Sequence, residues 1–303
     1  MFSLNKALPF GEKSEDDFVK IEGVVLGVVD PKDFATKEET ARLLNYGTSM
    51  GDDTMTAPKE SVWNPWHGCH RISSGCRFCS VFQKDYKYGR NPELVFKTKS
   101  FDLPICMDRT RHYRLNPENH LVHTCTTSDF FLPEADSWRG EAWSMMKSRP
   151  DLTFLINTKR PDRIADHLPG DWGDGSDYEN IHISCCVESQ YTADLRLRKF
   201  VTLPILHKSI TVDPMLGPVR ISKYLQSGEI EAASCSGESG PSARLCDFSW
   251  VLSLMLECVD NNVPFRFEMT GSNFRKGNEV YSVSEENQSA QAMKACVNYR
   301  VCG

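Results

Sequence analysis

Three cysteines occur at a spacing that suits metal binding. The segment WNPWHGCHRISSGCRFC places Cys69, Cys76 and Cys79 in a C-x6-C-x2-C arrangement. Three thiolates can hold three corners of a [4Fe–4S] cube, which leaves the fourth iron without a protein ligand. An open iron of this kind can bind the amino and carboxylate groups of S-adenosylmethionine, and electron transfer to the sulfonium then releases a 5′-deoxyadenosyl radical.

A structural zinc site is the alternative for the same thiols. His67 or His70 would complete a Cys3His set. Zinc sites usually pair two short-spaced cysteine knuckles, and the second knuckle is missing here. The other nine of the 12 cysteines are scattered along the chain. We therefore favour the cluster over zinc, and over a set of inert thiols.

The composition is that of an ordinary globular protein. The chain has 303 residues, of which 40% are apolar and 25% charged, and its formal net charge is -6. No long uncharged apolar run is present, and the start, MFSLNKALPFGEKSEDD, lacks the apolar core of a secretory signal. We expect a cytoplasmic protein with no membrane span. The charge argues against nonspecific coating of nucleic acid, although residues 109–114 (RTRHYR) form a local basic cluster.

Short apolar or β-branched segments alternate with helical patterns from residue 61 onward. Strands are predicted at 61–64, 120–126, 152–157, 181–187, 205–212, 230–234 and 264–268. Helices are predicted at 138–147, 161–167, 191–200, 221–226 and 248–261. This alternation predicts an α/β protein with a partial or nearly closed parallel (β/α) barrel of six to seven units. An open doubly wound sheet is the alternative.

Three regions are predicted along the chain. Residues 1–58 form an N-terminal extension, residues 59–282 form the barrel, and residues 283–303 form a C-terminal helical tail. In a parallel barrel the functional residues follow the strands, at their carboxyl ends. The residues found there are the cysteine loop, Ser128-Asp129, Thr158-Lys159-Arg160, Glu188, Asp213-Pro214, the segment SGESG at 236–240, and Thr270-Gly271. Their recurrence on one side of every unit predicts one shared pocket.

These motifs resemble those of a known family. WNPWHGC, SSGCRFC, SDFFLPEADSWRGEAW, NTKRPDRI, VESQYTADLRL, DPMLGPV and SGESGPSAR follow one another between about residues 62 and 281. In that order they resemble a three-cysteine family from phages and bacteria that is regarded as related to the radical S-adenosylmethionine enzymes. A more distant resemblance is to spore photoproduct lyase, which has a T-D-aromatic-x-P-x-E stretch where this chain has SDFFLPE at 128–134.

The resemblance implies a reaction class and its partners. It implies a radical enzyme that needs an electron donor such as flavodoxin or ferredoxin. The phage context of the family and the likeness to the lyase make a nucleic-acid base a candidate substrate. Ser128, Asp129 and Glu134 would bind the methionine part of the cofactor, with Asp129 receiving its amino group. Helix capping is the alternative role for Asp129 and Glu134.

Charged residues at other strand ends are the remaining candidates. Glu188 can bind the ribose hydroxyls of the adenosyl group. Lys159 and Glu238 are the candidate catalytic residues: Lys159, beside Arg160, can pair with a cofactor carboxylate or a substrate phosphate. Glu238 lies in a glycine-flanked turn of a kind that binds anions, with Arg244 nearby.

For two further pairs of residues we favour a packing role over a functional one. At most one of Cys185 and Cys186 faces the barrel, where it could donate a hydrogen atom, but a buried apolar role is favoured for both. Trp63 and Trp66 could stack on a nucleobase, and packing beneath the cysteine loop is favoured.

The chain also departs from the pattern of the family. Its first cysteine gap is six, where radical enzymes commonly have three. It has Ser80 where the family has tyrosine, Ser236 where the family has the first glycine of GGESG, and Glu268 where the family tends to have lysine. These departures support an iron–sulfur protein that has lost cofactor cleavage as the third hypothesis. The second hypothesis is a nucleic-acid-binding protein stabilised by zinc or a cluster, without catalysis.

Overall fold

A computed structural model of the chain describes residues 60–115 and 121–301. The predicted N-terminal extension lies outside the described residues, and so does His120 at the start of the second predicted strand.

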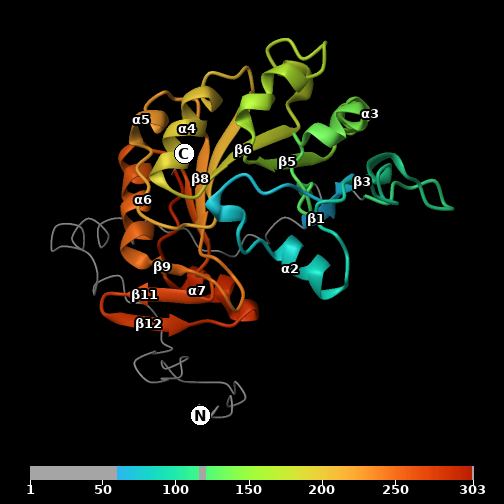
Figure 1. Cartoon of the computed structure of the whole chain (residues 1–303). Helices are drawn as coiled ribbons and strands as arrows, with labels where there is room; N and C mark the ends of the chain where they lie inside the picture. The colour runs from blue at the N-terminus through green and yellow to red at the C-terminus, as the bar shows by residue number, and fades with distance from the viewer. Residues whose placement is uncertain (1–59, 116–120, 302–303) are drawn as a thin grey trace.

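Seven parallel strands form one sheet that curls into a half barrel (Figure 1). They are β1 (Glu60–Trp63), β4 (Leu121–Thr124), β5 (Thr153–Thr158), β6 (Ile181–Val187), β7 (His207–Val212), β8 (Ala232–Ser236) and β10 (Phe265–Met269). Their order in the sheet follows their order in the chain, from β1 at one edge to β10 at the other. A doubly wound sheet would reverse its order near the middle. The partial parallel barrel is therefore confirmed.

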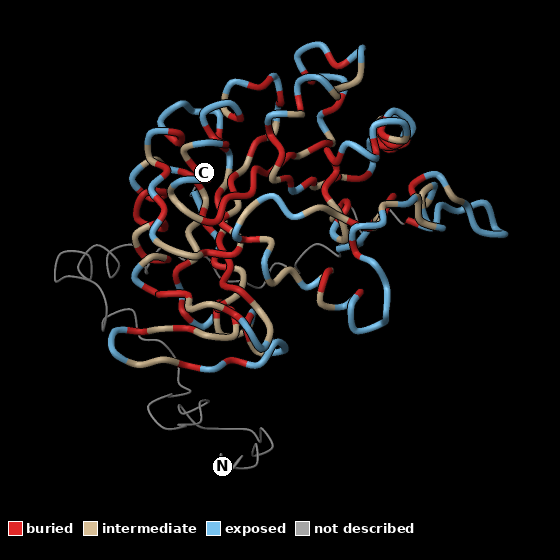
Figure 2. The backbone as a smooth tube through the Cα atoms, viewed as in Figure 1, coloured by how far each residue is buried: buried red, intermediate tan, exposed pale blue. Residues whose placement is uncertain are grey.

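Buried and more exposed residues alternate along several strands of this sheet (Figure 2). On β5, Phe154 and Ile156 are fully buried, whereas Leu155 is half-buried and Asn157 is exposed. Trp63 of β1 packs edge-on against Phe154, with ring centroids 5.8 Å apart. The apolar side thus forms the core, and the concave side carries the more polar residues.

Helices cover the outside of the half barrel and link its strands (Figure 1). They are α3 (Asp136–Lys147), α4 (Gln190–Phe200), α5 (Ser222–Leu225) and α6 (Phe248–Asp260). Local signals fix two of the helix starts: Ser189 and Thr192 form a capping box at α4, and Asp247 caps α6 by accepting a hydrogen bond from Ser249 N at 2.8 Å.

The helix predicted at 161–167 is replaced by two 3-10 turns, Pro161–Arg163 and Ala165–His167. Leu168 adopts an extended conformation because Pro169 follows it. The segment is also tied to the first residue of α3, since Arg163 Nη2 lies 2.8 Å from both carboxylate oxygens of Asp136. The helical turns therefore end at His167, ahead of Pro169.

Several elements were not predicted individually. Helix α2 (Ser80–Lys87) follows the last cysteine of the loop, and β2 (Trp66–His67) pairs with β3 (Phe96–Lys97). A second sheet contains β9 (Leu245–Asp247), β11 (Asn273–Lys276) and β12 (Glu279–Ser282). Helix α7 (Gln288–Lys294) follows and packs against β10. None of the described helices has the length and apolar character needed to cross a membrane.

Candidate metal and cofactor site

The cysteine loop leaves β1 and crosses the carboxyl ends of the neighbouring strands. Asn64 Oδ1 accepts hydrogen bonds from Thr126 Oγ1 and Thr127 N, both at 3.1 Å, which ties the loop to the end of β4. Gly68 has a φ of 95°, and a Cβ at this position would collide with the carbonyl of Leu94. Its own carbonyl accepts a hydrogen bond from Ser128 Oγ at 2.5 Å. Glycine is thus required where the loop bends onto the sheet.

The three cysteines are free thiols, each half-buried. Cys69 N donates a hydrogen bond to Pro92 O at 2.9 Å, Cys76 ends a 3-10 turn that begins at Ser74, and Cys79 is the N-cap of α2. The loop therefore fixes the backbone of all three cysteines before any metal binds.

The three thiols differ in spacing from the donors of a single zinc ion. Burial above all, and then the negative charge of Asp129, raises the pKa of Cys69 to about 12, with smaller contributions from Cys76 and Cys79. The three thiols are thus close enough to interact electrostatically. Within the described part of the chain, however, no group of three metal-donor atoms lying within 4.8 Å of one another includes a cysteine sulfur. Sulfurs around one tetrahedral zinc ion lie only about 3.8 Å apart, given a Zn–S bond of about 2.3 Å. The three sulfurs therefore do not all lie at the mutual spacing of a single tetrahedral zinc site.

The two histidines that could complete a zinc site are each paired with a carboxylate. His67 Nε2 lies 2.7 Å from Asp85 Oδ2, and His70 Nε2 lies 2.6 Å from Glu134 Oε1. Glu134, predicted to bind the cofactor, therefore contacts the cysteine loop directly. Its carboxylate orients the residue that follows Cys69.

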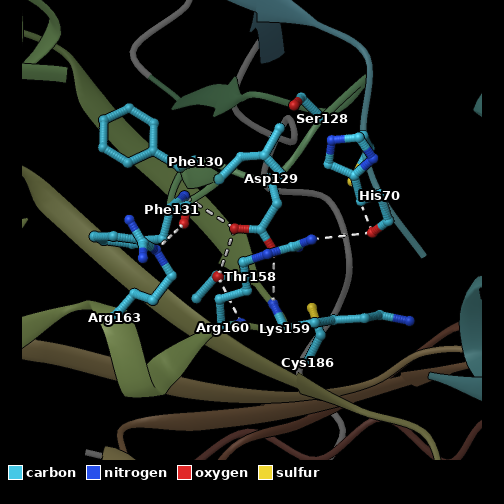
Figure 3. A network of polar contacts seen from close by, with 12 residues as sticks. His70, Ser128, Asp129, Phe130, Phe131, Thr158, Lys159, Arg160, Arg163 and Cys186 are labelled. Atoms are coloured by element: carbon cyan, nitrogen blue, oxygen red, sulfur yellow. Dashed lines mark hydrogen bonds and ion pairs between the residues drawn. The ribbon is translucent and has the colours of Figure 1, made fainter. Parts of the chain in front are cut away.

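Asp129 joins two strand ends to the cysteine loop (Figure 3). The residue is only 5% exposed, and its two carboxylate oxygens accept four hydrogen bonds. Oδ1 accepts from Thr158 Oγ1 at 2.8 Å and from Phe131 N at 2.9 Å, and Oδ2 accepts from Lys159 N at 3.0 Å and from Arg160 Nη1 at 3.1 Å.

Arg160 connects Asp129 to the cysteine loop by hydrogen bonds. Its Nη2 donates to the carbonyl of His70 at 3.0 Å, directly after Cys69 (Figure 3). The guanidinium is almost completely buried, so its only nearby carboxylate in the network, Asp129, balances its charge. Thus Asp129 positions the first cysteine through Arg160.

Lys159 and Glu188 lie directly beneath the second cysteine. A Cβ built on Gly75 would lie 2.9 Å from Lys159 Nζ and 3.1 Å from Glu188 Cδ. Lys159 Nζ is 3.8 Å from Glu188 Oε2. The loop therefore rests on the ends of β5 and β6, and a larger residue at position 75 would have to displace the side chain of Lys159 or Glu188.

Charge around Lys159 favours a thiolate at Cys76. Burial alone would raise the pKa of Cys76, but the Lys159 ammonium and hydrogen bonds at Ile72 and Ser73 outweigh it and lower the pKa. Burial likewise opposes the charge of Lys159, yet the surrounding acidic groups, of which Cys76 and Cys186 are the strongest, raise its pKa. Lys159 therefore remains a cation at the centre of the site.

Glu188 has an unsatisfied oxygen. The residue is fully buried, and its Oε2 accepts a hydrogen bond from Arg196 Nη1 at 2.8 Å. Its Oε1 is buried with no hydrogen-bond partner. Buried carboxylate oxygens nearly always have a donor, so this oxygen is free to accept a hydrogen bond from a ligand.

Glu238 is engaged with Arg244. Glu238 Oε2 accepts from Arg244 N at 2.9 Å and from Nε at 2.7 Å, and Oε1 accepts from Nη2 at 2.5 Å. The guanidinium lies over the ring of Phe78, 5.3 Å from its centroid. The SGESG segment thus holds the side of the cysteine loop that faces β8.

The structure also places the remaining candidate residues, the two tryptophans and Cys186. Trp63 and Trp66 are fully buried, and their Nε1 atoms donate to the carbonyls of Ser100 and Asp129, so the packing role that we favoured is confirmed. Cys186 faces Lys159 (Figure 3), and burial raises its pKa to about 12. Sequence reasoning missed Arg196, whose Nη1 donates to Glu188 Oε2 at 2.8 Å.

Comparison with known proteins gives a family. The model of a family described as "Protein of unknown function (DUF5131)" matches residues 55–295. No curated protein and no solved structure matches the chain.

Proposed function

We propose that this chain, which belongs to the DUF5131 family of proteins of unknown function, is a radical S-adenosylmethionine enzyme. In this proposal Cys69, Cys76 and Cys79 hold a [4Fe–4S] cluster. The observation that supports it most strongly is the set of three free thiols on one loop above the carboxyl ends of a parallel half barrel, spaced more widely than a single zinc ion requires. These cysteines would hold the cluster, and the cluster when bound would supply the one electron needed for reductive cleavage of S-adenosylmethionine.

The protein supplies orientation and charge around this chemistry. The free Oε1 of Glu188 is suited to accept a hydrogen bond from a ribose hydroxyl. The Lys159 ammonium, 3.8 Å from the other oxygen of Glu188, is suited to pair with a carboxylate or phosphate. Both groups lie against Gly75, one residue before a proposed cluster ligand.

Asp129 and Ser128 act mainly on the loop in this scheme. The four hydrogen bonds of Asp129 and the bond from Ser128 to the Gly68 carbonyl hold the backbone on which the methionine part would lie. Glu134 holds His70 in the same way. Glu238 braces Phe78 through Arg244, so we assign it a positioning role in place of a catalytic one.

The open side of the half barrel is the proposed route for substrate. Burial raises the pKa of Glu268 on β10, Arg266 lowers it, and Glu60 of β1 raises it further. Glu268 and Glu60 lie on the two edge strands, β10 and β1, which border this open side. A nucleic-acid base remains the candidate substrate, and an external donor such as flavodoxin or ferredoxin would deliver the electron.

The test is formation of 5′-deoxyadenosine. The full chain is purified without oxygen, reconstituted with iron and sulfide, reduced with dithionite and mixed with S-adenosylmethionine. We expect product from the wild type and none from the Cys69→Ala, Cys76→Ala, Cys79→Ala variant. Cys106→Ala, which removes a half-buried thiol outside the loop, is the matched control and should retain activity.

Two outcomes would contradict the proposal. A well-formed cluster that yields no 5′-deoxyadenosine would indicate an iron–sulfur protein without cofactor cleavage. Zinc bound by the same cysteines in protein prepared with or without oxygen would support the noncatalytic binding protein.

A further inference from the structure

A second group of metal-binding side chains lies at the opposite ends of the strands. His182, near the start of β6, is the register partner of His207, the first residue of β7. Their imidazole rings stack with centroids 4.2 Å apart and an interplanar angle of 12°. Glu231 directly precedes β8, and both of its carboxylate oxygens lie 3.0 Å from His207 Nδ1.

These three side chains bring their donor atoms to one point. One ligand atom from each lies within 4.8 Å of the other two, and no other group in the described part of the chain meets this criterion. Burial first, and then His207, lowers the pKa of His182, so its ring is neutral near pH 7 and can offer a lone pair.

The backbone beneath the group is held in place by the sheet. Six register pairs join β6 to β7, and Glu231 N donates to Lys208 O at 2.9 Å. The donors therefore come from neighbouring positions of a hydrogen-bonded sheet, which holds them close to a binding geometry.

The group is separate from the cysteine site. His182 and Cys186 are four residues apart on β6 and point to the same face, because side chains alternate along a strand. At a rise of about 3.3 Å per residue they are about 13 Å apart along the strand. The group thus lies deeper on the concave face, away from Lys159 and the cysteine loop.

We propose that His182, His207 and Glu231 bind a divalent transition-metal ion. Two imidazoles and one carboxylate form a donor set that suits Zn²⁺, Co²⁺ or Fe²⁺, and three protein ligands leave a position open for water or substrate. The proposal does not depend on the cluster or on its reaction.

The probe is Co²⁺, whose absorption spectrum reports its ligands. The full chain carrying Cys69→Ser, Cys76→Ser and Cys79→Ser removes competition from the loop thiols. We expect Co²⁺ to bind with nitrogen and oxygen ligands, without the intense charge-transfer bands of thiolate, and to raise the melting temperature. Titration and equilibrium dialysis give the affinity and the number of ions bound.

Substitution of the three proposed ligands tests whether they bind the ion. His182→Ala combined with His207→Ala should abolish binding, and Glu231→Gln should weaken it at least tenfold. Glu231 is exposed, so its variant should fold even if the double histidine variant does not. His112→Ala, which removes an exposed histidine outside the group, should bind Co²⁺ as the parent does. Equal affinity in the parent and in Glu231→Gln, or a thiolate-type spectrum, would overturn the proposal.

Discussion

Replacing Asp129 by asparagine should destabilise the protein strongly. The substitution keeps the shape of the side chain, and the amide oxygen can still accept from Thr158 and Phe131. The amide nitrogen, however, then faces two other donors, Lys159 N and Arg160 Nη1. Two hydrogen bonds to a charged acceptor are lost, and the guanidinium of Arg160 remains buried without a counter-charge.

The structure gives two routes to the magnitude. Hydrogen bonds to charged groups contribute about 1.5–3 kcal/mol each, so two of them amount to roughly 3–6 kcal/mol. Removing one partner of a buried ion pair costs about 3–5 kcal/mol. Both routes indicate a loss of about 4 kcal/mol, a large share of the total stability of about 5–15 kcal/mol typical of a folded protein.

Urea denaturation with reductant and chelator present measures this loss. Asp194→Asn is the control, because Asp194 also pairs with a cation, Lys223 Nζ at 2.7 Å, but on an exposed surface. We expect it to cost less than about 1 kcal/mol. If the two variants lose equal stability, Asp129 is not the link between strands and loop that the hydrogen bonds indicate. Iron content after reconstitution should also fall in Asp129→Asn alone.

Three further changes test other parts of the structure. Gly75→Ala should displace the side chain of Lys159 or Glu188 and so reduce iron incorporation. Gly140→Ala, on an open helix face, is the control; it should keep its iron content and stabilise the protein by up to about 1 kcal/mol. Equal iron content in the two variants would contradict the predicted displacement at position 75. Gly237→Ala would drive a methyl group into the carbonyl of Thr270 and should cost about 3 kcal/mol or more in urea denaturation, and a neutral result would argue against the close packing of these strand ends. The pKa of His182 is lowered by burial and by His207, and Glu231 opposes this, so below about pH 6.5 the unfolded chain binds a proton that the native chain does not. The free energy of unfolding, measured with chelator present, should therefore fall with decreasing pH, and it should fall less in His182→Asn. Identical pH dependence in the variant and the wild type would show that the pKa of His182 is not lowered by folding.

The strands of the half barrel were predictable because each is a short apolar or β-branched segment between turn residues. Segment 181–187 and strand β6 coincide, and most other bounds differ by one to three residues. Strands β9, β11 and β12 were not predictable, since LCD, NFRK and EVYS are too short and too polar to show a period. Helix α2 was missed because SVFQKDYK follows directly on a loop dominated by its cysteines.

The site was predictable in outline and not in detail. The rule that functional residues follow parallel strands identified Lys159 and Glu188 together, and the structure places them 3.8 Å apart. The partners of Asp129 and Glu238 depend on side-chain rotamers and on contacts distant in sequence, which no local pattern contains. The pairing of His182 with His207 depends on the register of β6 and β7, which only the folded sheet fixes.

The spectrum of the reduced cluster tests the central claim most directly. Protein reconstituted with iron and sulfide is reduced and examined by electron paramagnetic resonance before and after addition of S-adenosylmethionine, with the Cys69→Ala, Cys76→Ala, Cys79→Ala variant as control. We expect a [4Fe–4S]⁺ signal in the wild type alone and a change in its g values when the cofactor binds, because one iron has no protein ligand. A cluster signal that the cofactor leaves unchanged, or that persists in the variant, would contradict the assignment.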